Sequence, residues 1–361
     1  MKKMFIALAI AVLTSLYAHA FTQNLEYAAG IITDDDFARN PQAALELSET
    51  ASLALKPQNI FVYMTESVKS ILSGSYKELS LMLAVIILAA VLQIFSSNLG
   101  SLYGITEYVS LLSLMLICFN MITPLLLSVT DFLEHHTAFM TSVTATSSAL
   151  LSASGMPGSS AASSVSASFI TAFTQLCAVN IVLPAVKVII VLSSVGAISK
   201  WMNISGVTGF LKSFCSYGIG LLFAVFLGVH SLTLSISASA DSIAFRSLRF
   251  TAARLIPVAG GMISESIKTV LAGMSLIKNT AGGIGIAYII YTAIPAITSV
   301  LTFKLSVIIA IAVSKLFGTG RHTAFLEGLN GASNLIFAIC IFASFGGIII
   351  LAVFMKINTA L

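Results

Sequence analysis

Lys187 and Lys304 are the charged residues in this sequence whose surroundings point most directly to chemistry. Each stands where a proline-containing apolar segment meets a short apolar segment. A lysine at membrane depth is energetically costly, so it normally faces protein or a water-filled cavity and marks a functional site. The sequence therefore makes both lysines candidate pore positions. One alternative stays open, because neither lysine has an acidic residue nearby in sequence: both ammonium groups snorkel to the headgroup region.

The residues able to bind metals or form disulfides lack the spacing that such sites need. His135 and His136 stand alone in sequence, and we expect them to be solvated rather than to bind a metal. The run Asp34–Asp36 lacks the spaced ligands and turn glycine of a calcium loop, so we expect a solvated helix start. The four cysteines lie in apolar segments without a C-x-x-C pair, which predicts small buried side chains; they are Cys118, Cys177, Cys215 and Cys340. No metal or other cofactor is predicted.

Sequence motifs for catalysis or nucleotide binding are missing from the chain. It has no G-x-S-x-G, Walker A, H-E-x-x-H or dinucleotide-binding fingerprint in a suitable strand–turn–helix context. The net charge of +4 is scattered without a basic run or an aromatic stacking face, so we expect no nucleic-acid ligand. We therefore expect a protein that is not an enzyme.

The elements that must position these residues are transmembrane helices. The chain is 57% hydrophobic and 9% charged, and its mean hydropathy is +1.00. Globular domains average about 25% charged residues, and a helix needs about 20 apolar residues to cross the hydrocarbon. The sequence predicts an all-α polytopic membrane protein with six to eight transmembrane helices, and it excludes a soluble domain.

Five apolar segments are the clearest predicted spans: Leu79–Ser96, Tyr108–Val129, Ser213–Ser235, Gly283–Phe303 and Leu335–Met355. Four further segments are less clear, because they are short, only moderately apolar or rich in small residues: Ser164–Val186, Val188–Ser199, Val258–Ile277 and Leu305–Ser314. Short, interrupted apolar segments are typical of the binding sites of transporters.

The start of the chain, residues 1–20, reads as a signal peptide. Two lysines precede a short apolar run, and Ala18 and Ala20 provide the small side chains of a cleavage site. We expect cleavage after Ala20; an uncleaved amphipathic anchor is the alternative. Residues 21–78 then form an extracytoplasmic helical N-terminal region, and residues 79–361 form the multi-span membrane domain.

An internal duplication is visible in the membrane domain. Ser199-Lys200, Thr208 and Phe210-Leu211 recur 115 positions later as Ser314-Lys315, Thr323 and Phe325-Leu326. We therefore predict two repeats, residues 108–207 and 214–322, with the last helix repeating the first helix of the unit once more. Chance similarity between apolar sequences of shared composition is the alternative.

The connectors inside the two repeats differ in composition. Residues 141–168 are mostly Ser, Ala, Thr and Gly and carry no charge. They predict either a tightly packed or re-entrant helix or a flexible linker. In the second repeat, Arg246, Arg249 and Arg254 share an amphipathic face suited to anionic lipid or to a partner. Glu265 and the lysine three positions later would lie on the same face of a helix, where their opposite charges could neutralise each other.

The stretch Ala253–Glu265, ARLIPVAGGMISE, resembles the stage III sporulation protein AE family of endospore-forming bacteria. The length of the chain, its signal peptide and its order of spans extend the likeness over essentially the whole sequence. The positions carried over as a signature are Pro257, Gly260, Gly261, Met262, Ser264 and Glu265. The glycine pair permits close helix contact or a break within a re-entrant segment.

The resemblance implies a role in endospore formation. Members of that family belong to an operon set that, with a forespore-side membrane partner, builds a secretion-like channel between mother cell and forespore. The resemblance implies a permease-like membrane component in the mother-cell membrane around the forespore, with the other stage III sporulation proteins of the operon and the lipid bilayer as its partners. It implies no catalytic residue and no cofactor. Two alternatives stay open: a free-standing secondary transporter built from two repeats, and a non-conducting membrane scaffold.

Overall fold

The computed structural model describes the chain from residue 53 to residue 356, apart from 96–100, 154–155, 200–203, most of 227–259 and a few single positions; the side chains of 260–278 also fall outside the description. The elements are α3 (Pro57–Ile94), α5 (Ser101–Ala153), α6 (Pro157–Cys177), the π-helix η2 (Ala178–Val182), α7 (Leu183–Ile198), a helix over Gly206–Phe226 that we call the 206–226 helix, α9 (Gly260–Leu316) and α10 (Gly320–Lys356). Within these residues, six helical segments are long and apolar enough to cross a membrane. The structure therefore confirms the all-α, multi-pass fold, with a span count inside the predicted range.

The helices are longer than a bilayer requires. α5 has 53 residues and α9 has 57, so at 1.5 Å per residue each is about 80 Å long, against about 30 Å of hydrocarbon. The predicted interruptions at Lys187 and Lys304 are wrong, because each lysine lies inside a continuous helix, α7 or α9. Lysine lowers the local hydropathy but has good helix propensity, so hydropathy alone misplaces the helix ends.

A short π-helix joins α6 to α7 just before Pro184. A proline inside an α-helix lacks its N–H donor, and its ring collides with the carbonyl group four residues earlier, here that of Asn180. The N–H of Leu183 donates to the carbonyl of Ala178 instead, which widens the turn. α6, η2 and α7 therefore form one long rod.

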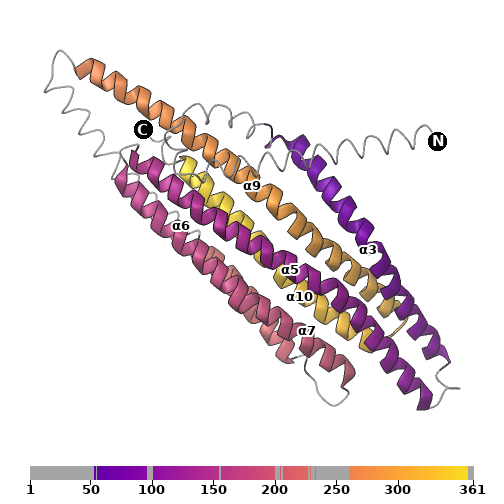
Figure 1. The fold of residues 1–361 in the computed structure, drawn as a ribbon. Helices are drawn as coiled ribbons and strands as arrows, with labels where there is room; N and C mark the ends of the chain where they lie inside the picture. Colours follow the sequence, from indigo (N-terminus) through magenta and orange to yellow (C-terminus); the bar gives the residue numbers. More distant parts are fainter. Residues whose placement is uncertain are drawn as a thin grey trace, which may run out of the picture.

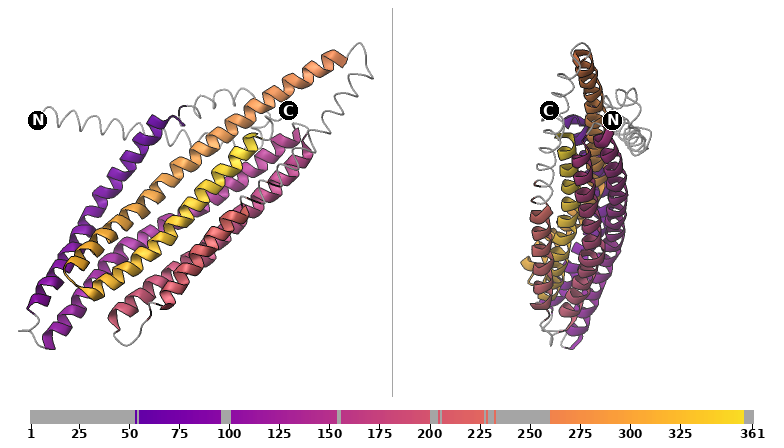
Figure 2. Two further views of the ribbon diagram at one scale, coloured as in Figure 1. Left: turned by 180° about the vertical axis from the view of Figure 1, so that it is seen from behind. Right: turned by 90° about the vertical axis from the view of Figure 1, so that its left-hand side faces the viewer.

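The helices form a flattened bundle, broad in one view and narrow in the perpendicular view (Figure 2). α10 packs against both α9 and α7; α3 packs on α9 and α5 at one edge, and the rod of α6, η2 and α7 lies toward the other edge (Figure 1). At one end of the bundle, which we call the turn end, α3 ends, α5 begins and α9 turns into α10. At the opposite end, the terminal end, α3 begins and α10 ends (Figure 1).

The buried core of the described residues has two large clusters along the bundle axis and a small third one around Ala287 and Tyr291. The larger cluster lies nearer the turn end and includes Met82, Leu114, Val186, Phe303 and Phe325. The second lies nearer the terminal end and includes Phe139, Leu151, Ile284, Ile350 and Phe354. α10 contributes to both clusters, so it ties the two halves of the bundle together.

The exposed surface of α5 changes character along its length. Toward the turn end its exposed large side chains are apolar: Ile105, Val109, Leu112, Leu116 and Leu127. Beyond Leu127, the exposed positions include Asp131, Glu134, His135 and Thr141, and the described part of α5 exposes no large apolar side chain. An apolar face of this length matches lipid, and the polar face beyond it matches water or headgroups.

The two edges of the bundle depart from that pattern near the terminal end. On α6, Val165, Phe169 and Phe173 are exposed at helical spacing, and the rings of Phe169 and Phe173 stack with centroids 5.7 Å apart. On α3, Phe61 and Met64 are exposed. These edges therefore carry apolar side chains where the neighbouring face of α5 is polar.

The serine-rich segment forms a packed helical hairpin between α5 and α6. The hydroxyl of Ser160 is 2.8 Å from the hydroxyl of Ser148, accepts a hydrogen bond from Ser152 at 2.7 Å and donates to the carbonyl of Ser148. Further along, Thr137 donates to the side chain of Gln175 at 2.9 Å. Small side chains let the two backbones approach and their hydroxyl groups bond across the gap. Of the two predicted readings, the structure supports the packed helix.

The turn regions of the two predicted repeats share a local geometry. At the start of the 206–226 helix, the N–H and the hydroxyl of Thr208 both donate to the carbonyl of Ile204. At the start of α10, the N–H and the hydroxyl of Thr323 donate in the same way to the carbonyl of Thr319. Gly318, at φ +71°, lets α9 reverse tightly into α10. The duplication as a whole stays a prediction.

Candidate functional site

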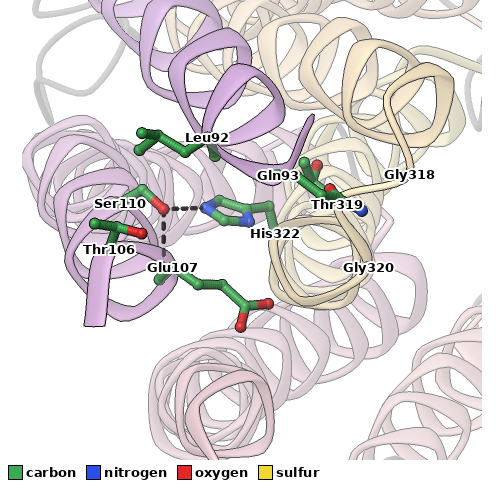
Figure 3. Close-up of a pocket in the computed structure, with 10 residues that line it drawn as sticks. Leu92, Gln93, Thr106, Glu107, Ser110, Gly318, Thr319, Gly320 and His322 are labelled. Atoms are coloured by element: carbon green, nitrogen blue, oxygen red, sulfur yellow. Dashed lines mark hydrogen bonds between the residues drawn. The ribbon is translucent and has the colours of Figure 1, made fainter. Parts of the chain in front are cut away.

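Polar side chains from three helices meet in a small pocket at the turn end (Figure 3). The pocket holds about 50 Å³ and is lined by Gln93 of α3, Thr106, Glu107 and Ser110 of α5, and Thr319 and His322 around the start of α10. Ser110 and His322 are buried, at 6% and 2% exposed. The pocket has room for water molecules but not for a large ligand.

A short hydrogen-bond chain links Glu107, Ser110 and His322. The hydroxyl of Ser110 lies 2.9 Å from the carbonyl of Glu107, to which it can donate. The Nε2 atom of His322 lies 3.1 Å from the same hydroxyl oxygen, and it is the donor of this second bond when the hydroxyl hydrogen points to the carbonyl. In that arrangement this pair is a structural link and not an activated nucleophile.

An ion pair lies beside this pocket. The Nε atom of Arg321 is 3.3 Å from Oε1 of Glu107, and the two side chains are 14% and 23% exposed. The guanidinium carbon is also 4.5 Å from the centroid of the Tyr108 ring, a cation–π geometry. The buried Nη1 and Nη2 atoms have no hydrogen-bond partner among the described residues. The pair therefore fastens α5 to the start of α10.

These turn-end residues are the ones that the sequence did not single out. Glu107 and Arg321 are 214 positions apart in the sequence, and neither belongs to a recognisable motif. The available signal was that each is a charge at the edge of an apolar span. Opposite charges at the same membrane boundary are candidates for pairing, but a sequence without contact information does not say which charges meet.

The structure does not bring Lys187 and Lys304 together. α7 and α9, which carry them, each pack against α10, so the two lysines lie on different parts of the bundle. Lys187 is exposed among apolar neighbours. Lys304 is partly buried, with Nζ 5.6 Å from the centroid of the Phe337 ring, a cation–π geometry. The two lysines line no common cavity among those found in the described residues.

The family-signature positions lie at or before the start of α9. Gly260 is the first residue of that helix, and Gly261, Met262, Ser264 and Glu265 occupy its first turns. The beginning of α9 projects beyond the neighbouring helices at the terminal end (Figure 1). Pro257 and the cleavage-site residues Ala18 and Ala20 lie outside the described residues, as do the side chains of these first turns.

The cysteines and histidines are placed mainly by packing. All four cysteines are free and buried. His135 is exposed, as the sequence predicted, but the prediction of a solvated His136 is wrong, because that ring is 7% exposed and packs 5.8 Å from the ring of Phe132. Adjacent residues on a helix face about 100° apart, so one points out while the other points inward. Among the described residues, no three of His, Cys, Asp and Glu are grouped to hold a metal.

Comparison with known proteins decides the family. A sequence profile of the stage III sporulation protein AE family matches residues 42–358. The chain belongs to this family. A curated stage III sporulation protein AE from Bacillus subtilis (strain 168) is 28% identical over 210 residues, which cover 58% of this chain and 52% of the relative. The match thus spans about half the length of that relative, and no solved structure matches the chain.

Family membership confirms the resemblance found in the sequence. It places the chain among sporulation proteins, and the six apolar helices make it a multi-pass membrane protein. This is not a known enzyme family. The profile match covers every described helix from the start of α3 to the end of α10.

Proposed function

We propose that this protein is the permease-like membrane component of a secretion-like channel assembly between mother cell and forespore. It sits in the mother-cell membrane around the forespore and works with other stage III sporulation proteins of its operon and a forespore-side membrane partner. Its place in the family supports a role in sporulation. The observation that carries the finer proposal is the division of the bundle into a lipid-matched half and a polar half.

The lipid-matched half is the one nearer the turn end. On α5, the exposed large apolar side chains lie between Ile105 and Leu127, with Asn120 and Thr123 as exposed polar positions among them. This stretch rises about 33 Å at 1.5 Å per residue, which is the thickness of one hydrocarbon core. The remaining turns of α5, from Asp131 to Ala153, then stand about 35 Å beyond the hydrocarbon. A helical bundle of that height provides a rigid platform outside the membrane for other proteins.

The expected signal peptide supports placement of the turn end on the cytoplasmic side. A cleaved signal peptide leaves the residues that follow it on the extracytoplasmic side, so α3 begins there and ends at the cytoplasmic side. The charges do not carry this assignment, because Arg246, Arg249 and Arg254 lie in the connection at the other end. With six spans, the beginning of α3 and the end of α10 then both lie on the extracytoplasmic side, facing the space between the two membranes.

The structure favours a component of an assembly over a free-standing transporter. Secondary transporters bind their cargo near the bilayer midplane between repeats. The cavities found in the described residues lie elsewhere: the two beside His136 and Ser147 hold about 20 Å³ each and are in the polar half, and those of about 50 and 360 Å³ are at the turn end. The exposed Phe169 and Phe173 of α6 instead offer a protein-docking face in the polar half.

The test compares two stacked phenylalanine pairs on exposed faces. Phe169→Ala with Phe173→Ala should abolish recovery of the other stage III proteins and block sporulation, because it removes the docking face. Phe210→Ala with Phe214→Ala is the matched control: these rings also stack, with centroids 6.2 Å apart, but they lie on the 206–226 helix. Recovery of the complex should survive in the control. Unchanged assembly of the α6 variant, or transport by the purified chain alone, would overturn the proposal.

A further inference from the structure

A cavity of about 360 Å³ lies at the turn end between α7, the 206–226 helix and α10. Its polar and small lining includes Ser193 and Gly196 of α7, Gly209 and Lys212 of the 206–226 helix, and Gly328 of α10. Leu192, Ala197, Ile204 and Ala324 add apolar lining, and Thr208 and the acidic Glu327 add polar lining. The cavity is large enough for part of a small amphiphile, and Lys212 and Glu327 are its two charged lining residues.

Glycines create the space and position the lysine. A Cβ atom at Gly209 would meet nothing within 4 Å, so this position faces open space. A Cβ atom at Gly331 would overlap Cε and Nζ of Lys212, so the lysine side chain lies directly against α10 at this glycine. A Cβ atom at Gly328 would likewise overlap the side chain of Ser193. The three helices therefore meet closely around the cavity without filling it.

Lys212 and Lys315 share one neighbouring carboxylate, that of Glu327. The Nζ atom of Lys315 lies 2.7 Å from its Oε1 atom, and the same carboxylate attracts the charge of Lys212. Among the described residues, the hydrogen bond of Lys212 is a long one, 3.5 Å, from Nζ to the backbone carbonyl of Glu327. An ammonium group has three donors, so two remain available to an anion. Two lysines and one glutamate give this corner a net charge of +1 by their formal charges.

The depth of Lys212 in the membrane matches a lipid headgroup. The 206–226 helix begins at Gly206, so Lys212 lies about 9 Å along it from the turn end. Phe210, Phe214 and Tyr217 of the same helix are exposed apolar side chains suited to acyl chains. Lys315 lies in the last turn of α9 at the same end. The ammonium group therefore stands at the inner edge of the polar zone of one leaflet.

We propose that this cavity binds the headgroup phosphate of an anionic phospholipid, with Lys212 as the phosphate-binding cation and the apolar lining around the glycerol end of the acyl chains. Basic pockets between transmembrane helices on the cytoplasmic side are suited to such headgroups, and lysine binds phosphate as a point charge. The site rests on the proposed placement of the turn end in the membrane, but not on the channel role. It gives the membrane domain a preference for anionic lipid beside the turn between α7 and the 206–226 helix.

The test measures lipid bound to the purified full chain in detergent, by native mass spectrometry. Phosphatidylglycerol, phosphatidylcholine and inorganic phosphate are added separately. Wild type should retain phosphatidylglycerol in preference to phosphatidylcholine, and Lys212→Gln should lose roughly tenfold in affinity, because one charge-assisted interaction is removed. Gly209→Leu should lose a similar factor by filling the cavity while leaving the charge in place.

Two matched variants control for general effects on lipid binding. Lys187→Gln removes an exposed lysine of α7, and Gly220→Leu adds the same side chain to an exposed position of the 206–226 helix where nothing lies within 4 Å. Both should bind phosphatidylglycerol as the wild type does. If Lys212→Gln and Gly209→Leu bind like wild type, the proposal is wrong. Binding of inorganic phosphate through Lys212 with no preference for phosphatidylglycerol would assign the site to a free anion and also overturn it.

Discussion

At the scale of single residues, two ion pairs near the turn end differ in their exposure. Glu107 and Arg321 are 23% and 14% exposed, whereas Glu327 and Lys315 are 52% and 59% exposed. A charge that loses its partner in a largely buried place is destabilising, because water cannot fully replace the partner. An exposed pair contributes little, because water and salt screen it.

Glu107→Gln should therefore destabilise the bundle by about 1–3 kcal/mol, since it leaves the Arg321 guanidinium without its carboxylate. Glu327→Gln should change the free energy of unfolding by less than about 1 kcal/mol. Denaturant unfolding of the purified proteins in one detergent gives both values. Equal effects of the two substitutions would show that the Glu107 pair is not a structural fastening.

At the scale of elements, the hairpin of α5 and α6 is held by hydroxyl groups in place of large side chains. Ser160 is 4% exposed and bonds to both Ser148 and Ser152. Ser164, one turn later, bonds only to the carbonyl of Ala161 on its own helix. Replacing each serine in turn therefore compares the loss of hydrogen bonds between two helices with the loss of a hydrogen bond within one helix.

Ser160→Ala should cost about 1–3 kcal/mol, because two neighbouring hydroxyl groups lose their partner. Ser164→Ala, the matched control, should stay within about 0.5 kcal/mol of wild type. The same unfolding measurement in detergent compares them. If Ser164→Ala is as destabilising as Ser160→Ala, the hydroxyl contacts between the helices do not stabilise the hairpin.

The sequence predicted the presence of the helices better than their ends. Runs of apolar residues predict the membrane domain, but Lys187 and Lys304 mislead the prediction of helix ends, because lysine lowers hydropathy without lowering helix propensity. The serine-rich segment left a helix and a linker equally open, because its packing depends on the facing helix. The contact between Glu107 and Arg321 joins distant helices, so only the fold reveals it.

At the scale of the whole molecule, six spans place both ends of the described bundle on one side of the membrane. A compartment-sensitive reporter fused after Leu361 should therefore report the extracytoplasmic side, whereas the same reporter inserted between Ser199 and Gly206 should report the cytoplasm. The two reporters should differ because the connection between Ser199 and Gly206 lies at the turn end, which faces the cytoplasm, whereas the C-terminus lies at the terminal end. Cytoplasmic activity of the C-terminal fusion would contradict the proposed topology.

In the proposed arrangement, the turn-end half of the bundle spans the membrane and the other half projects from it. Single cysteines along the exposed face of α5 test it, since the four native cysteines are buried. In purified protein reconstituted into lipid nanodiscs, Thr141→Cys and Ala149→Cys should react with a membrane-impermeant maleimide, and Leu112→Cys and Leu116→Cys should not. Unreactive cysteines at 141 and 149, with reaction at 112 or 116, would contradict the account.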